Sequence, residues 1–104
     1  MISKPMISRH WGAIVKRERA SDYIAHLRSE TFPRLRAIHG FVAATVQRRD
    51  AADGVEFVVI TQWRSMDAIR AFAGADAEAA VVPPHAQAMM VSYDARVRHY
   101  EVIE

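Results

Sequence analysis

The chain has 104 residues, 51% of them hydrophobic, and its 14 basic and 12 acidic side chains leave a formal net charge of +2. That length suits a single domain spanning 1–104, with a core of modest size. The basic residues are scattered and form no stripe, which speaks against a nucleic-acid partner. The lack of cysteine excludes disulfides, thiolate catalysis and cysteine metal sites. No apolar run is long enough to cross a bilayer, so we expect a cytoplasmic protein without a membrane partner.

The first elements are a short arm and a strand. Residues 1–6 carry little pattern, and we interpret them as a loose N-terminal arm. Residues 7–16 alternate in hydrophobicity and predict a strand with Trp11 on one face and His10 on the other. Arg9 is the exception on the apolar face of that strand.

A long helix is predicted over residues 20–38 from its stripe of apolar side chains. Pro33 lies inside this span and favours a kink or break near Thr31. The Thr31 hydroxyl is suited to cap the second piece. Gly40 follows the helix and is suited to a left-handed C-terminal residue.

Two β-rich segments come next, at residues 41–49 and 55–63, and the polar residues between them predict a hairpin. Ser65 is a good N-cap for a second helix that runs to about Ala73.

The last third of the chain contains weaker signals. Residues 75–82 keep a helical composition until Pro83 and Pro84 interrupt it. Residues 85–91 predict one more short helical piece, and residues 95–103 alternate as a last strand.

The element order is β-α-β-β-α-β, which indicates an α+β fold of the ferredoxin-like kind with an antiparallel sheet. Both helices of such a fold cover the same face of the sheet. The third strand is apolar on both faces, with Val58 and Ile60 opposite Phe57 and Val59. An uncovered apolar face must be buried, so we expect a homodimer in which two sheets pack face to face as a dimeric α+β barrel. Trp11 is expected to fill that barrel.

Four segments carry a resemblance to a known family: RHWGAIVK, HGFVAA, VVITQWRS and MDAIRAF. Together they resemble the antibiotic biosynthesis monooxygenase (ABM) domains of the dimeric α+β barrel superfamily. The resemblance implies either cofactor-independent oxidation of phenolic compounds by O2 or degradation of haem. An ungapped comparison places the haem-ligating histidine of the second group at Val82, its asparagine at His10 and its tryptophan at Phe72. All three residues differ from those of the haem-degrading members, and Val82 cannot ligate iron. Haem is therefore possible but not favoured.

The function favoured by this resemblance is a small cofactor-independent monooxygenase that acts on an aromatic or quinol-like molecule. His10 is the predicted catalytic residue, as proton acceptor or hydrogen-bond partner. Trp63 and Phe72 are predicted walls for the substrate, and His85 and Tyr93 are predicted orienting groups. Two alternatives stay open: a non-catalytic binder of a hydrophobic metabolite, and haem binding with altered ligation by His10 or His85.

No metal site is assigned from the sequence. Its histidines lack the i, i+4 or short-loop spacing of a zinc site. They are His10, His26, His39, His85 and His99. A glycine-rich phosphate loop is also missing, so no nucleotide cofactor is expected.

Overall fold

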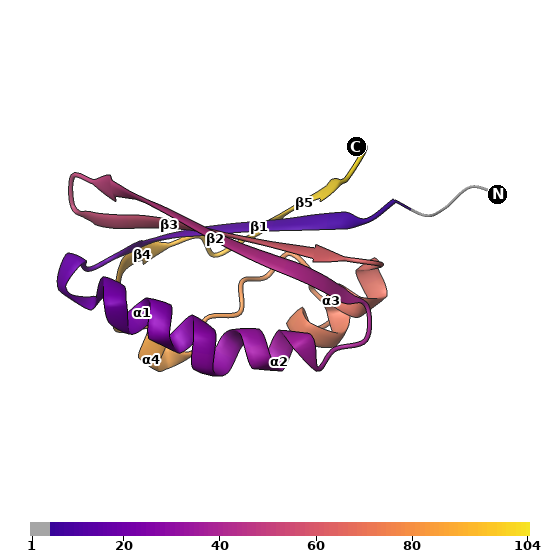
Figure 1. Ribbon diagram of the computed structural model, residues 1–104, viewed down its shortest axis with the longest axis horizontal. Coiled ribbons are helices and arrows are strands. Elements are labelled where there is room, and N and C mark those ends of the chain that lie inside the picture. The colour runs from indigo at the N-terminus through magenta and orange to yellow at the C-terminus, as the bar shows by residue number, and fades with distance from the viewer. Residues whose placement is uncertain (1–4) are drawn as a thin grey trace.

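The computed structural model describes residues 5–104. Its strands and helices are β1 (Ile7–Val15), α1 (Ala20–His26), α2 (Phe32–Arg36), β2 (Phe41–Ala51), β3 (Gly54–Trp63), α3 (Met66–Ala73), α4 (Pro84–Gln87), β4 (Met90–Tyr93) and β5 (Arg98–Glu101). The strands form one antiparallel sheet in the order β2-β3-β1-β4, and β5 also pairs with β1. All helices lie on the same side of this sheet (Figure 1).

The strand order confirms the predicted α+β, ferredoxin-like fold. Two short strands share the place of the fourth strand: β4 pairs with residues 13–15 of β1 and β5 with residues 7–10. The helical piece predicted over residues 85–91 is wrong in its second half. α4 ends at Gln87, and Met90 is paired with Val15 and buried, because the sheet edge offers it both backbone partners and an apolar surface.

The first helical region is continuous, so the chain does not break near Thr31, and the irregularity predicted there is a distortion within the helix. A π-helical turn, Leu27–Thr31, joins α1 to α2, and Pro33 lies in the first turn of α2. Proline has no N–H, so one helical hydrogen bond is missing here, and the wider turn accommodates this gap. Thr31 has helical backbone angles and does not cap the second piece. The prediction for Gly40 is confirmed, since its φ is 97°.

The segment after α3 forms bends, a turn and then a β-bridge, and the helix predicted over residues 75–82 is wrong. Ala79 forms a β-bridge with Arg96, and the Val97 N–H donates to the Glu78 carbonyl at 2.8 Å. These backbone contacts with the chain beside β5 replace the hydrogen bonds of a helix. The alanine-rich composition of this segment favours a helix and gives no sign of these long-range backbone contacts.

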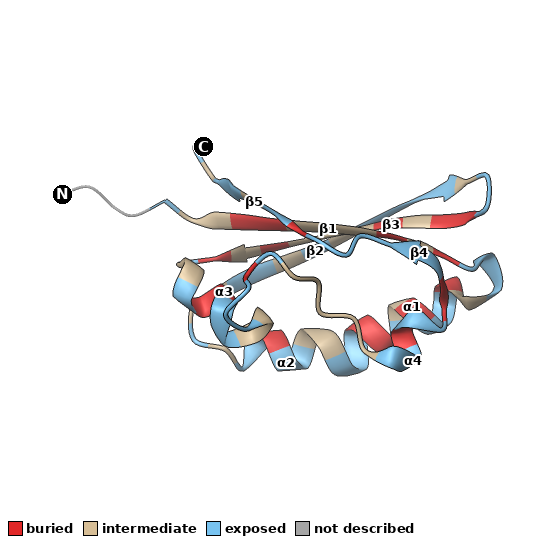
Figure 2. Ribbon diagram, turned by 180° about the vertical axis from the view of Figure 1, so that it is seen from behind, coloured by how far each residue is buried: buried red, intermediate tan, exposed pale blue. Residues whose placement is uncertain are grey.

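The core lies between the sheet and the helices (Figure 2). Its largest side chains with almost no exposure are Val15, Leu35, Phe57, Trp63 and Ile69. Within residues 5–104 no helix lies on the opposite face of the sheet (Figure 1). In the same range, no helix is both long and apolar enough to cross a membrane.

Candidate functional site

A cavity of about 70 Å³ lies between the sheet and the helices. Strands β1 and β3 form one side of it, α1 and α2 another, and the segment before α4 a third. Most of its wall is apolar. The polar side chains that reach the wall are Arg9, Tyr23, Thr31 and Thr61.

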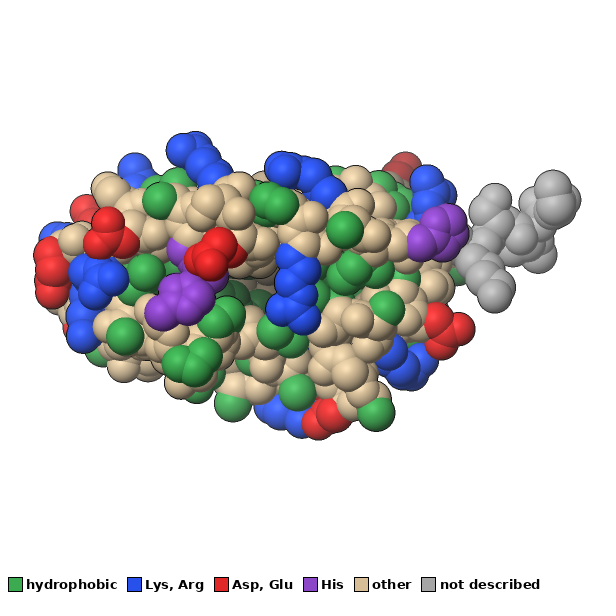
Figure 3. Space-filling view, turned by 90° about the horizontal axis from the view of Figure 1, so that it is seen from below, with side chains coloured by type: hydrophobic (Ala, Val, Ile, Leu, Met, Phe, Trp, Pro, Cys, Tyr) green, Lys and Arg blue, Asp and Glu red, His purple; other side chains and the backbone are tan. Residues whose placement is uncertain are grey.

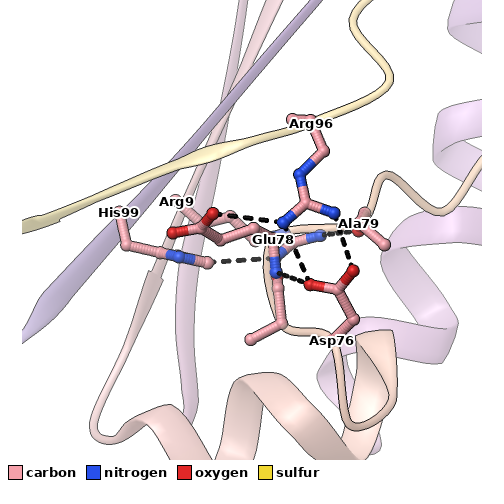
Figure 4. A network of polar contacts seen from close by, with 7 residues as sticks. Arg9, Asp76, Glu78, Ala79, Arg96 and His99 are labelled. Atoms are coloured by element: carbon pink, nitrogen blue, oxygen red, sulfur yellow. Dashed lines mark hydrogen bonds and ion pairs between the residues drawn. The ribbon is translucent and has the colours of Figure 1, made fainter.

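Arg9 places a buried cation at this cavity. The residue is only 5% exposed, and its guanidinium donates to the carbonyls of Ala77 and Ala79, the latter at 2.9 Å. A third contact, at 3.0 Å, joins Arg9 Nη1 to His99 Nε2 (Figure 4). Burial lowers the pKa of Arg9 to about 10, which still leaves the group charged at neutral pH.

The neighbour of this cation is a neutral histidine. Burial, and secondarily the charge of Arg9, lowers the pKa of His99. The Nε2 atom of neutral His99 can accept a hydrogen bond from the Arg9 guanidinium, so the two groups interact without charge repulsion.

An exposed ion-pair network holds the loop whose carbonyls accept from Arg9. Arg96 contacts Asp76 at 2.7 Å and Glu78 at 3.2 Å (Figure 4). Exposed pairs of this kind stabilise only weakly, but two carboxylates on one guanidinium fix the position of the loop. The network therefore positions the Arg9 side chain from outside the cavity.

Three hydroxyl groups complete the polar part of the wall, those of Tyr23, Thr31 and Thr61. Tyr23 packs edge-on against Phe57, and burial raises the pKa of its phenol, so it keeps its proton. The Thr61 hydroxyl accepts a hydrogen bond from Trp63 Nε1 at 2.8 Å, which leaves its own proton available.

The structure places the predicted aromatic residues in three positions. Phe72 lines the cavity, and Trp63 is fully buried behind it, stacked on Phe72 with ring centroids 6.0 Å apart. Tyr93 is 38% exposed and tilted against Trp11, and it is not among the residues that line the cavity. Trp11 lies on the opposite face of the sheet from His10, as predicted, but it packs on the helix-side core and lines the cavity, so the expectation that it fills a barrel between two sheets is wrong. The alternation of hydrophobicity along residues 7–16 assigned the side chains to the correct faces of the sheet. The cavity lies on the face that carries Trp11.

His10 lies on the face of the sheet away from the helices. Its Nε2 is 2.7 Å from the Ser8 hydroxyl, and its ring contacts the edge of Tyr100. It does not belong to the cavity wall described above. An open hollow of about 530 Å³ on this face is lined by His10, Gly12 and Tyr100, among other residues.

His85 lies at the entrance to the cavity, in a second hollow of about 230 Å³ that we call the vestibule. The vestibule and the cavity share lining residues, including Thr31, Phe72 and Pro83. His26 and Glu30 line it as well, and histidine and acidic side chains gather beside a hollow on this surface (Figure 3).

Sequence reasoning singled out neither Arg9 as a site residue nor the pair of His26 and Glu30. The signal for Arg9 was its place on an otherwise apolar strand face. The signal for the pair was their i, i+4 spacing on one helix. Their approach to His85 has no sequence signal, because a fold contact across 55 residues brings it there.

The cavity residues do not fit a haem. A volume of about 70 Å³ is too small for the macrocycle, and the described residues of the wall include no histidine or cysteine. Val82, where the family's haem ligand falls, is on this wall and has no ligating atom.

The sequence profile for antibiotic biosynthesis monooxygenases matches residues 9–90. The chain belongs to this family. The match to ABM proteins covers β1 through the start of β4, and thus most of the cavity wall. Among curated proteins, no sequence matches the chain.

Solved structures similar to this ABM protein include two from Streptomyces. SnoaB from Streptomyces nogalater, a cofactor-independent oxygenase, is 19% identical with a TM-score of 0.60, over 98% of this chain and 96% of that one. The monooxygenase from the gene ActVA-Orf6 of Streptomyces coelicolor, in complex with nanaomycin D, is 17% identical with a TM-score of 0.59, over 97% and 89%.

A NIPSNAP family protein from Agrobacterium tumefaciens is also similar, at 14% identity and a TM-score of 0.66, over 100% of this chain and 91% of that one. At such identities these likenesses establish a shared fold.

Proposed function

We propose that this ABM protein is a small monooxygenase that oxidises a phenolic or quinol-like molecule in the helix-side cavity without a cofactor. The observation that carries the proposal is a charged guanidinium, Arg9, at the wall of an otherwise apolar cavity. Membership of the family supports it, as does the likeness to SnoaB, which is described as a cofactor-independent oxygenase.

The cation favours the ionised form of a phenolic substrate. A positive charge in a low-dielectric cavity lowers the pKa of a bound phenol, which can then release its proton to water in the vestibule. Tyr23 keeps its own proton and is suited to donate a hydrogen bond to a substrate oxygen. Electron-rich phenolate is the form that can pass an electron to O2.

The overall reaction balances without an external reductant. A phenol with a free ring position and O2 give a quinone and water. One oxygen atom enters the ring and the other leaves as water, while the substrate supplies four electrons. The protein's part is to bind the ring, hold the phenolate beside Arg9 and exclude bulk water.

The cavity volume limits how a ring can bind. Benzene is known to bind in a cavity of about 150 Å³. The cavity found here, at about 70 Å³, is smaller than that. An aromatic substrate therefore has to occupy the vestibule too, and to displace the wall between them. Val81 and Pro83 belong to that wall and lie in a segment without helix or strand, which makes it the part best suited to move.

The predicted role of His10 as proton acceptor is the competing proposal. His10 could act only on a substrate bound at the other face of the sheet, where a second subunit would have to enclose it. A homodimer through that face is part of our proposal, but catalysis on the cavity side does not depend on it.

Oxygen uptake with a panel of phenols and quinols tests the proposal. We expect turnover of at least one compound, and Arg9→Gln should lower its rate about 100-fold, the usual effect of losing one group that stabilises an anion. Arg9→Lys keeps the charge and should lose less. Arg98→Gln removes an exposed cation from β5 and should leave the rate unchanged. Full turnover by folded Arg9→Gln would overturn the assignment of Arg9.

The alternative of a non-catalytic binder is favoured by the mainly apolar wall. Saturable binding of a panel compound without any oxygen uptake would support it instead of the monooxygenase.

A further inference from the structure

Three side chains at the vestibule converge on one point. His26 Nδ1 lies 2.7 Å from Glu30 Oε2, and His85 Nε2 lies 3.0 Å from both of these atoms. His26 is buried, whereas Glu30 and His85 are half-exposed. The three atoms thus form a nearly equilateral triangle that is anchored on one side and open on the other.

Protons alone cannot satisfy this triangle. An imidazole nitrogen is either a donor or an acceptor, not both. If both histidines donate to the Glu30 carboxylate, two N–H groups face each other at 3.0 Å. If either nitrogen is unprotonated, its lone pair faces the carboxylate. As long as Glu30 is ionised, every placement of protons on the two histidines leaves one of the three contacts unfavourable.

A single cation satisfies all three atoms at once. With metal–ligand distances of about 2.0 to 2.2 Å, neighbouring ligand atoms lie about 2.8 to 3.1 Å apart around an octahedral ion and about 3.3 to 3.6 Å apart around a tetrahedral one. The edges of the triangle, 2.7 to 3.0 Å, are close to the octahedral distances and shorter than the tetrahedral ones. Two imidazoles and one carboxylate form a donor set for a first-row divalent ion such as Zn²⁺ rather than for Ca²⁺ or Mg²⁺.

The surroundings orient the ligands for this task. His26 and Glu30 are spaced i, i+4 across the π-helical turn, a distortion that often marks functional sites. The other ring nitrogen of His26 lies 3.2 Å from the Thr31 hydroxyl, which can hold it as the N–H tautomer and leave Nδ1 for a metal. Pro83 and Pro84 fix the start of α4, which carries His85.

We propose that His26, Glu30 and His85 form a binding site for a divalent transition metal at the mouth of the cavity. The ion would take three ligands from the protein and keep its remaining positions toward the vestibule. It would place a positive charge at the entrance that a phenolic substrate has to pass. This site goes beyond the proposed oxygenase reaction, which draws no step from it.

Metal titration of the chelator-treated protein tests the proposal without any turnover. We expect Co²⁺ to bind saturably at one ion per chain with a visible d–d spectrum, and Zn²⁺ to displace it. His85→Ala and Glu30→Gln should weaken Co²⁺ binding at least tenfold. Thr31→Val, which removes only the partner of the His26 ring, should weaken it about tenfold.

His39→Ala is the matched control, because His39 is an exposed histidine outside the cluster. It should leave the affinity and spectrum unchanged. His85 and Glu30 are half-exposed, so their variants should fold, and thermal melts can verify this. Lack of saturable Co²⁺ binding by the wild type, or an equal loss in His39→Ala, would overturn the proposal. Either result is independent of whether phenols are oxidised.

Discussion

At the scale of single residues, Arg9 and its neutral partner His99 are the clearest departure from an ordinary apolar core. The groups that face His99 are Arg9, Arg70 and Glu78, of which the two arginines lower its pKa and the glutamate raises it. Burial is the largest cause of the lowered pKa. Protonation of His99 is therefore easier in the unfolded chain than in the folded one.

This difference predicts a loss of stability in mild acid. As the pH falls below the unfolded value of about 6.5, the unfolded state takes up a proton that the folded state resists, so the free energy of unfolding decreases. His99→Gln keeps an acceptor for Arg9 and removes the titration. Urea unfolding at pH 7 and pH 5 should show a smaller decrease for His99→Gln than for the wild type.

His39→Gln, at an exposed position, is the control and should keep the wild-type decrease. An equal decrease in the wild type and His99→Gln would contradict the role given to His99.

At the scale of elements, the turn between α2 and β2 depends on glycine. Gly40 has a φ of 97°, and a Cβ there would lie 2.6 Å from the Cβ of Ala68 in α3. Gly40→Ala should lower the free energy of unfolding by about 2–4 kcal/mol, because it adds a clash to a left-handed backbone. Gly74 has a φ of 90°, and a Cβ added there would have no atom within 4 Å. Gly74→Ala should therefore lower the free energy of unfolding by only about 1–2 kcal/mol. Chemical denaturation measures both, and equal losses would show that Ala68 does not restrict the turn.

The elements set by local chemistry could be predicted from the sequence. Ser65 was assigned as an N-cap, and its hydroxyl accepts from the Ala68 N–H at 3.1 Å. The strands at residues 7–16 and 55–63 were visible because alternation reports burial directly. The stretches 75–82 and 88–91 were not, because backbone contacts with distant strands outweigh their local helical preference.

The candidate site was less predictable for the same reason. Phe72 lines the cavity, and its role as a substrate wall stays a prediction, as does the role of His10, which was favoured from a strand pattern that cannot say which face holds the substrate. The meeting of His26 and Glu30 with His85 depends on where the chain runs after two prolines. No local pattern records that path.

At the scale of the whole molecule, the uncovered face of the sheet predicts self-association. Ile14, Val58 and Ile60 lie there, each partly buried within the single chain. Val58→Lys should place a charge in the centre of the proposed dimer contact and shift the protein toward monomer. Sedimentation velocity over a range of concentrations measures this shift.

Ser21→Lys, on the exposed side of α1, is the control for added charge and should remain dimeric. A wild-type protein that stays monomeric at every concentration would contradict the dimer and would leave the apolar face unexplained.

The central claim is that oxidation takes place in the cavity beside Arg9 and not at the opposite face of the sheet. The most direct test is the initial rate of oxygen uptake, with one accepted phenol, for the wild type, Arg9→Gln and His10→Ala. The account predicts a rate about 100-fold lower for Arg9→Gln and an unchanged rate for His10→Ala. Full activity in folded Arg9→Gln, together with its loss in His10→Ala, would contradict the account and move the chemistry to the other face.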